Sequence, residues 1–419
     1  MVELLFAAGV LVAAFVGYNI GGSSTGVAFG PAVGSRIVRK ATAAALFTLF
    51  AFIGGWTVGR NVITTMSSRI VPSTLFTPEA SVGVLFFTGA ALLVSNVYGV
   101  PASTSMTAVG AIVGLGLARG DLDRALMFGI VSAWIVAPLV GFAAGVVSGR
   151  YLYPHLDARL SFGRLTDPLI RIDRSGGLPR PRLTQTASRR DVAGSVLVLA
   201  IACYMGFSAG ASNVANAVAP LVADDALSVD AGVFLAIGAI GLGGFTIARR
   251  TLDTVDDGIT DLPILAALIV STVGATIITI LSALGIPASL AVTSTCCIIG
   301  LGWGRASRAN TLAELATPPA GAGAEEVPKP ATGPLAASPT EDEAPRTPTV
   351  GELASEETEP TERPPESEPS VTPIGAEEPE ELPAESLFDS AATARIVFLW
   401  ILTPVVSVIG SYLLFAFFV

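Results

Sequence analysis

The sequence predicts an all-α polytopic membrane protein made of two inverted-topology repeats with broken helices. Of its 419 residues, 51% are hydrophobic and only 14% are charged, and the mean hydropathy is +0.66. Uncharged stretches such as 41–59 and 82–100 reach the roughly 18 residues that a helix needs to cross a bilayer. Several segments of the first half also recur in the second half in the same order.

Ten apolar segments mark the expected helices. They are 2–35, 41–59, 80–100, 101–118, 125–149, 191–223, 229–247, 262–285, 286–303 and 392–419. The first and sixth would each measure close to 50 Å as one helix, whereas the hydrocarbon core of a bilayer is about 30 Å thick. We therefore expect each of these two segments to break, tilt strongly or turn back.

Loop charges orient the segments. Nine arginines lie between 150 and 190, which places this loop in the cytoplasm, because basic residues concentrate on that side. The N-terminus and the C-terminus then both lie outside, in a multi-pass protein of the cell membrane. Arg36 and Lys40 agree with this orientation, whereas Arg60 and Arg69 count against it.

The net charge of −10 belongs to one segment. Residues 311–390 contain 19 acidic and 3 basic residues, and the remainder contains 15 acidic and 21 basic residues. A segment rich in Pro, Glu, Ser, Thr and Ala buries too little apolar surface to fold, so it should be a disordered linker. We therefore predict that residues 1–149 form the first transmembrane repeat and that residues 150–190 form an arginine-rich cytoplasmic loop. The main part of the second repeat covers 191–305, the disordered acidic insert covers 306–390, and the last helix of the second repeat covers 391–419.

Internal repetition supports the two-repeat organisation. "GYNIGGSSTGVAFGP" from Gly17 matches "GFSAGASNVANAVAP" from Gly206 at an offset of 189, and "GVPASTSM" from Gly99 matches "GIPASLAV" from Gly285 at 186. Each half has five segments, which is an odd number of membrane crossings. The second half therefore enters the membrane from the opposite side and has the opposite orientation. Secondary transporters often have this architecture, with interrupted helices and a substrate site near the midplane.

The paired polar interruptions are the leading candidates for a site. A broken helix leaves free N–H groups and a positive dipole end, which attract an anion. The candidates are Ser23, Ser24, Thr25, Ser212, Asn213 and Asn216. The alternative is that small residues here only allow close helix packing. A second pair of segments adds Ser103, Thr104 and Ser289, which would either contact the substrate or cap a helix.

These segments resemble the duplicated signature of the inorganic phosphate transporter (PiT) family, usually G-A-N-D-V-A-N-A followed by a Gly/Pro turn. "GASNVANAVAP" from Gly210 is the closer copy, and "GGSSTGVAFGPAVGS" from Gly21 is more diverged. "PASTSM" from Pro101 is similar to the family's P-x-S-T-T-H segment, and W-x-x-x-P elements follow at Trp134 and Trp400. The resemblance implies an ion-coupled anion symporter.

The chain departs from that family pattern at charged positions. Ser24 and Asn213 stand where the signature has aspartate, and Met106 stands where the third motif has histidine. The predicted spans contain no Asp, Glu or His away from their ends, so proton coupling through a buried side chain is disfavoured. Coupling to sodium stays open, since neutral Ser, Thr and Asn oxygens and backbone carbonyls can bind this ion.

We therefore expect a secondary active transporter of inorganic phosphate, working by cation-coupled symport. Two alternatives stay open: transport of sulfate or another oxyanion, and an anion sensor that signals through the acidic insert without transporting. No base adjoins the candidate serines, so an enzyme is not expected. No catalytic residue, metal or cofactor beyond the sodium ion is expected. The expected partners are the oxyanion, the lipid bilayer and a second copy of the chain in a homodimer, with no nucleic acid.

Overall fold

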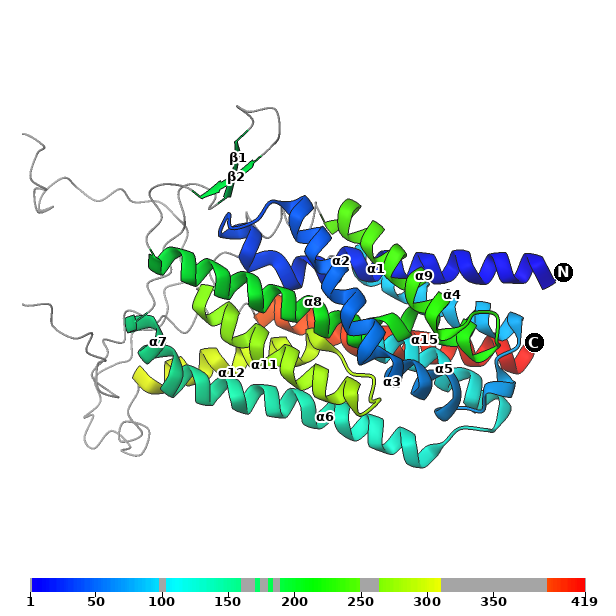
Figure 1. Ribbon diagram of the computed structural model, residues 1–419. Coiled ribbons are helices and arrows are strands. Elements are labelled where there is room, and N and C mark those ends of the chain that lie inside the picture. The colour runs from blue at the N-terminus through cyan, green and yellow to red at the C-terminus, as the bar shows by residue number, and fades with distance from the viewer. Residues whose placement is uncertain are drawn as a thin grey trace, which may run out of the picture.

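The computed structural model describes residues 2–97, 103–159, 170–173, 180–183, 189–248, 264–309 and 390–418. These residues form an elongated helical bundle (Figure 1). In chain order its helices are α1 Val2–Gly34, α2 Lys40–Thr57, α3 Gly59–Thr64, α4 Pro78–Val97, α5 Thr104–Arg119, α6 Arg124–Val147, α7 Tyr153–Arg159, α8 Arg189–Ala223, α9 Val229–Thr246, α11 Ile264–Ala283, α12 Leu290–Ala309 and α15 Ser390–Phe417.

Short segments complete the described fold. They are the π-helical turns η1 (Thr65–Arg69) and η3 (Ser148–Leu152), the 3-10 turn η2 (Ser73–Leu75), and the strands β1 (Ile170–Asp173) and β2 (Arg180–Leu183). The two strands pair antiparallel as a hairpin between α7 and α8. Eight of the described helical segments are long and apolar enough to cross a membrane. The predicted all-α membrane fold is confirmed. Most of the predicted acidic insert lies outside the described residues, and α12 continues to Ala309, past the predicted boundary at 305.

The expected breaks in the first and sixth segments are wrong. The α1 helix runs unbroken for 33 residues and α8 for 35 residues, through both glycine-rich signatures. Pro31 and Pro220 lie within the last turn of each helix, so any bend that they cause affects only the helix end. The Thr25 hydroxyl donates to the Gly21 carbonyl one turn earlier, so this polar residue is accommodated inside a regular helix.

The signature glycines instead let helix backbones touch, as in the alternative interpretation. A Cβ on Gly21 of α1 would overlap the Ile240 carbonyl of α9, and a Cβ on Gly210 of α8 would overlap the Ala51 carbonyl of α2. These two contacts are equivalent under the offset of 189. Such close approach between membrane helices requires glycine. Helix packing explains the glycines without a helix break.

Contacts between the halves also match in pairs. The α1 helix packs on α9 and α2 packs on α8, while α5 packs on α15 and α6 packs on α12. The Ser407 hydroxyl donates to the Thr107 carbonyl, and at the equivalent place Gly141 lies against the Thr293 carbonyl. Figure 1 shows α1 and α8 starting at opposite ends of the bundle. A duplicated chain would produce such matched contacts; the inverted topology itself stays a prediction.

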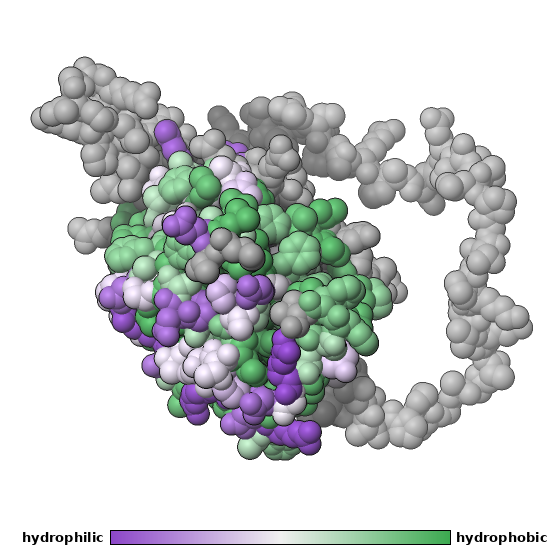
Figure 2. Space-filling model, turned by 90° about the vertical axis from the view of Figure 1, so that its right-hand side faces the viewer, coloured by the Kyte–Doolittle hydropathy of each residue, from purple (hydrophilic) through white to green (hydrophobic). Residues whose placement is uncertain are grey.

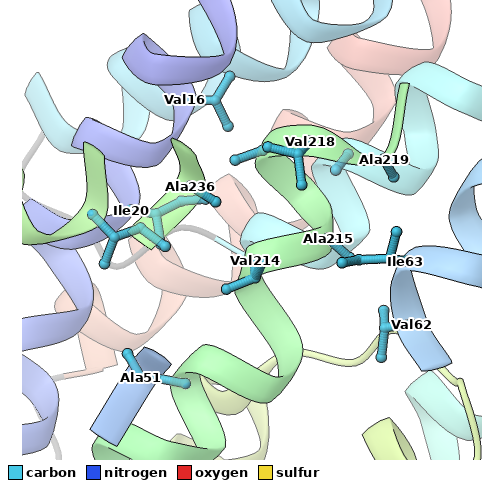
Figure 3. Packing of buried hydrophobic residues seen from close by; sticks show 14 of the residues in the cluster. Val16, Ile20, Ala51, Val62, Ile63, Val214, Ala215, Val218, Ala219 and Ala236 are labelled. Atoms are coloured by element: carbon cyan, nitrogen blue, oxygen red, sulfur yellow. The ribbon is translucent and has the colours of Figure 1, made fainter. Parts of the chain in front are cut away.

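Apolar side chains from both halves surround α8. Figure 3 shows Val214 and Val218 of α8 among Ile20 of α1, Ile63 of α3 and Ala236 of α9. Each of these side chains is almost fully buried. Close packing of small and branched side chains supplies the attraction between helices in a membrane, where the hydrophobic effect is weak. The α8 helix is therefore held firmly at the centre of the bundle.

Charged residues gather at the end of the bundle that carries both termini. Figure 2 views this end, where hydrophilic side chains cover much of the centre. The exposed charged residues there include Arg69, Glu79, Arg119, Asp123 and Asp225. The Arg60 guanidinium, which belongs to α3, pairs with the Asp230 carboxylate of α9 and so joins the two halves.

Two helix ends lie inside the bundle instead of at its surface. The α5 helix has 16 residues, or about 24 Å at 1.5 Å per residue, which is shorter than the hydrocarbon core. It ends at Arg119 near the charged end, so its first residue, Thr104, is buried within the bundle. The α12 helix similarly begins next to buried Ser289, after a turn in which Gly285 has a φ of 75°.

Candidate functional site

A cluster of neutral polar side chains forms where α5 begins against the middle of α8. The Thr104 hydroxyl donates to the Asn213 Oδ1 over 2.5 Å. The Asn216 Nδ2 donates to the same Oδ1 over 3.1 Å and to the Ser105 Oγ over 3.2 Å. All four side chains are buried. The cluster therefore joins the α5 helix of the first half to the α8 helix of the second half.

Two polar atoms of this cluster have no hydrogen-bond partner. They are the Ser103 Oγ and the Asn216 Oδ1, and both residues are at most 1% exposed. Burying a polar atom without a partner costs about 1 to 3 kcal/mol, so such atoms usually have a role. Here one hydroxyl and one amide oxygen are free to bind a ligand.

The N-terminus of α5 is also uncapped. Ser103 occupies the capping position but its side chain makes no capping hydrogen bond. At the equivalent start of α12, the Ser289 Oγ accepts a hydrogen bond from the Val292 N–H over 3.4 Å. The first N–H groups of a helix lack intrahelical partners and carry the positive end of its dipole. The α5 N-terminus therefore offers donors to an anion, and the cluster beside it contains no charged side chain.

The structure brings together only some of the residues predicted to form the site. Thr104, Asn213 and Asn216 meet in the cluster described above, and Ser103 directly precedes Thr104 at the start of α5. The hydroxyls of Ser23, Thr25 and Ser212 instead donate to carbonyls within their own helices. Ser24 is half-buried on α1. Within the described residues, no hydrogen bond links the Ser23 to Thr25 run to the cluster.

Ser289 caps α12 and borders a small recess. This recess lies between α5, α6 and α12 and is lined in part by Met106, Trp134, Ser289 and Thr293. The Trp134 Nε1 donates to the Pro287 carbonyl over 2.7 Å and so holds the turn before α12. The capping role expected as one alternative for Ser289 is the one that the structure supports.

Ser105 belongs to the cluster but was not among the residues predicted from the sequence. It follows the two chosen residues in "PASTS", but nothing in the spacing says which hydroxyl of this segment faces α8. Asn213 and Asn216 offered the usable signal, because amide side chains three residues apart lie on one face of a helix. Their partners became visible only once α5 was placed against that face.

Comparisons with known proteins agree with this fold. The model of the phosphate transporter family matches residues 20–165 and 176–337. The sulfate permease CysP of Bacillus subtilis is 31% identical over 297 residues, which cover 70% of this chain and 76% of that protein. The inorganic phosphate transporter 2-1, chloroplastic, of Arabidopsis thaliana is 24% identical over 403 residues, covering 75% of this chain and 69% of that protein.

A solved structure shares the fold. It is described as the sodium-dependent phosphate transporter and matches with a TM-score of 0.65 at 16% identity, covering 98% of each chain. The family match and the candidate spans confirm the expectation of a multi-pass protein of the cell membrane that is a transporter and not an enzyme. The chain belongs to the phosphate transporter family.

Proposed function

We propose that the protein is a secondary active transporter of inorganic phosphate, coupled to a cation. One observation carries the proposal: the uncapped N-terminus of α5 lies buried beside the free Ser103 hydroxyl and the amides of α8. An anion binds readily at such a helix end. The relatives named for phosphate and the family match support this substrate.

The free Asn216 Oδ1 favours phosphate over sulfate. This oxygen can only accept a hydrogen bond, and it is buried without a donor. Phosphate keeps a proton on at least one oxygen near neutral pH, so it can donate to an amide oxygen, whereas sulfate is fully ionised and has no proton to donate. A site with a buried acceptor discriminates against a ligand that leaves this acceptor unpaired.

Sulfate is nevertheless the second candidate. The 31% identity to the sulfate permease CysP is the observation that favours it. The N–H groups of α5 and the Ser103 hydroxyl would serve either tetrahedral oxyanion, since both present acceptor oxygens. The two substrates therefore differ chiefly in what they offer to Asn216.

Sodium is the coupling cation that the residues support. The neutral oxygens of Ser103 and Ser105 can bind Na⁺, while the spans contain no Asp, Glu or His away from their ends to carry a proton. Alternating access would then come from movement of one part of the duplicated bundle against another.

Uptake into proteoliposomes tests the proposal. The purified protein is reconstituted, and entry of labelled phosphate and labelled sulfate is measured under an inward gradient of Na⁺ and, as the control, of K⁺. We expect phosphate uptake that the Na⁺ gradient stimulates. Sulfate uptake without phosphate uptake would refute the substrate, and equal uptake with either cation would refute sodium coupling.

A further inference from the structure

A line of hydroxyl groups follows α8 from the polar cluster toward the start of that helix. Tyr204, Ser208 and Ser212 recur every four residues and so lie on one side of α8. The Ser208 hydroxyl, which is fully buried, donates across the helix interface to the Ala275 carbonyl of α11 over 3.0 Å. The Tyr204 hydroxyl donates to the Thr276 Oγ1 of α11 over 3.3 Å. Hydroxyl and amide side chains therefore recur along α8 over about 14 Å, from Tyr204 at this interface to Asn213 in the polar cluster.

The facing helices carry buried hydroxyls that have no partner. Within the described residues these include the Thr279 and Ser282 hydroxyls of α11 and the Ser294 hydroxyl of α12. Ser294 lies between α11 and α12, close enough that a Cβ on Gly274 would lie 2.5 Å from its Oγ. Gly274 adjoins Ala275, the residue that binds Ser208. Serine and threonine in membrane helices commonly bond to their own backbone, but these three do not.

The first half keeps polar side chains at only some of these positions. Under the same offsets, Asn19, Ser23 and Asn96 correspond to Ser208, Ser212 and Ser282. Apolar residues replace the other four: Phe15, Ala90, Leu93 and Ala108 correspond to Tyr204, Thr276, Thr279 and Ser294. The equivalent interface of α1 and α4 packs without those four hydroxyls, with the Phe15 ring against Gly89. A packing requirement would apply to both halves, so the hydroxyls found only in the second half need another explanation.

We propose that this hydroxyl-lined seam between α8 and the α11/α12 hairpin is the path by which the oxyanion and its water pass between the polar cluster and the end of the bundle where α8 begins. The inference rests on the proposed function for its substrate class. In the present structure the seam is closed by the bonds from Ser208 to Ala275 and from Tyr204 to Thr276. It opens when the hairpin moves away from α8.

The chemistry of the seam suits passage of an anion. Hydroxyl groups can donate to an oxyanion or replace its water, and none of them carries a charge that would hold the ion tightly. Conduction requires binding that is strong enough to admit an ion and weak enough to release it. The free hydroxyls of Ser282 and Ser294 would be satisfied by water or substrate in the open state.

Cysteine labelling tests the path directly. In a full-length protein whose Cys203, Cys296 and Cys297 are replaced by alanine, Ser208→Cys is exposed in membrane vesicles to an impermeant, negatively charged methanethiosulfonate reagent. The matched control is Ser407→Cys, since Ser407 is equally buried and also donates to a carbonyl of a neighbouring helix, but packs between α15 and α5.

We expect the cysteine at 208 to react about tenfold faster than the cysteine at 407, because a packed interface opens only by rare local unfolding. Reaction should come from the side on which α8 begins, and inorganic phosphate should slow it. Equal rates at the two positions, or reaction from the opposite side alone, would overturn the path. If Ser208→Cys does not fold, Ser294→Cys replaces it with the same expectation. The labelling reaction does not depend on transport of phosphate. A failure of the proposed transport activity would therefore appear in the proteoliposome assay, and a failure of the proposed path would appear in the labelling rates.

Discussion

Thr104 and Asn213 connect the two halves of the protein at its candidate site. Their hydrogen bond of 2.5 Å places the uncapped start of α5 against α8. Asn216 binds the same Asn213 oxygen and keeps its own oxygen free. The important residues are therefore those that make bonds between helices, whereas Thr25 makes its bond inside one helix.

Replacing Thr104 by valine tests the importance of that bond. Thr104→Val removes the only donor from α5 to Asn213 and should weaken phosphate uptake by roughly 5- to 30-fold in KM, as expected for the loss of about 1 to 2 kcal/mol. Thr403→Val is the control, because Thr403 is also buried but bonds only within α15. If Thr25→Val impairs uptake more than Thr104→Val does, the site lies on α1 as the sequence suggested.

Titration of the Asp224 carboxyl group should make the stability of the folded protein depend on pH. Asp224 follows the last residue of α8, and its partial burial raises the pKa of the carboxyl group above the usual value, an effect that a hydrogen bond from the Ala226 N–H partly offsets. The folded protein then binds this proton more tightly than the unfolded chain. Stability from this group is present below the usual pKa and is lost as the pH rises through the raised pKa.

Asp224→Asn removes this titration while keeping an oxygen that can accept from Ala226. As the pH rises from the usual carboxyl pKa through the raised pKa of Asp224, we expect the variant to lose less stability than the parent protein. Thermal unfolding in detergent, measured as a pH series for both proteins, gives the comparison. Parallel curves would show that burial of Asp224 does not affect stability.

The helices α1 and α8 owe their positions to glycines that touch carbonyl groups of the opposite half. Gly21 meets Ile240 and Gly210 meets Ala51, and Gly54 and Gly243 meet carbonyls in the same matched way. Because these helices are continuous, the discontinuities at membrane depth are the starts of α5 and α12 instead. Short helices that end inside the bundle therefore supply the free N–H groups expected from broken helices.

Gly21→Ala should destabilise the bundle. The added methyl group would overlap the Ile240 carbonyl, and overpacking of this kind costs about 1 to 3 kcal/mol. Gly238→Ala is the matched control on α9, since nothing lies within 4 Å of a Cβ built there. That variant should be neutral or slightly stabilising, because alanine favours helix more than glycine does. Thermal unfolding in detergent measures both, and equal melting temperatures would contradict the proposed close contact.

In the whole molecule, helices of each half pack against helices of the other half. Each half contributes one long helix that packs on the other half's second helix, and Arg60 with Asp230 adds an ion pair between α3 and α9. The final helix, α15, packs on α5 and α4 of the first half. The last helix of the second half is therefore held by contacts with the first half.

Removing residues 311–389 tests what the insert does. With a flexible Gly/Ser linker joining α12 to α15, we expect phosphate uptake within about twofold of the parent protein, because loop length has a small effect on stability and both helices keep their own partners. A matched deletion with the same linker but lacking α15 as well should be inactive. Loss of uptake in the insert deletion alone would favour a regulatory role for the insert.

By itself the sequence determined the membrane class, the number and order of apolar segments, and the family, because hydrophobic length and internal repetition are local properties of the chain. It also indicated Thr104, Asn213 and Asn216, which the structure brings together, although their role in binding stays a prediction. Only the tertiary structure decided that α1 and α8 are continuous, and that Ser105 joins the cluster while Ser23 to Thr25 do not. A glycine-rich segment can either break a helix or admit a neighbouring helix, and which of the two occurs depends on the backbone that packs against it.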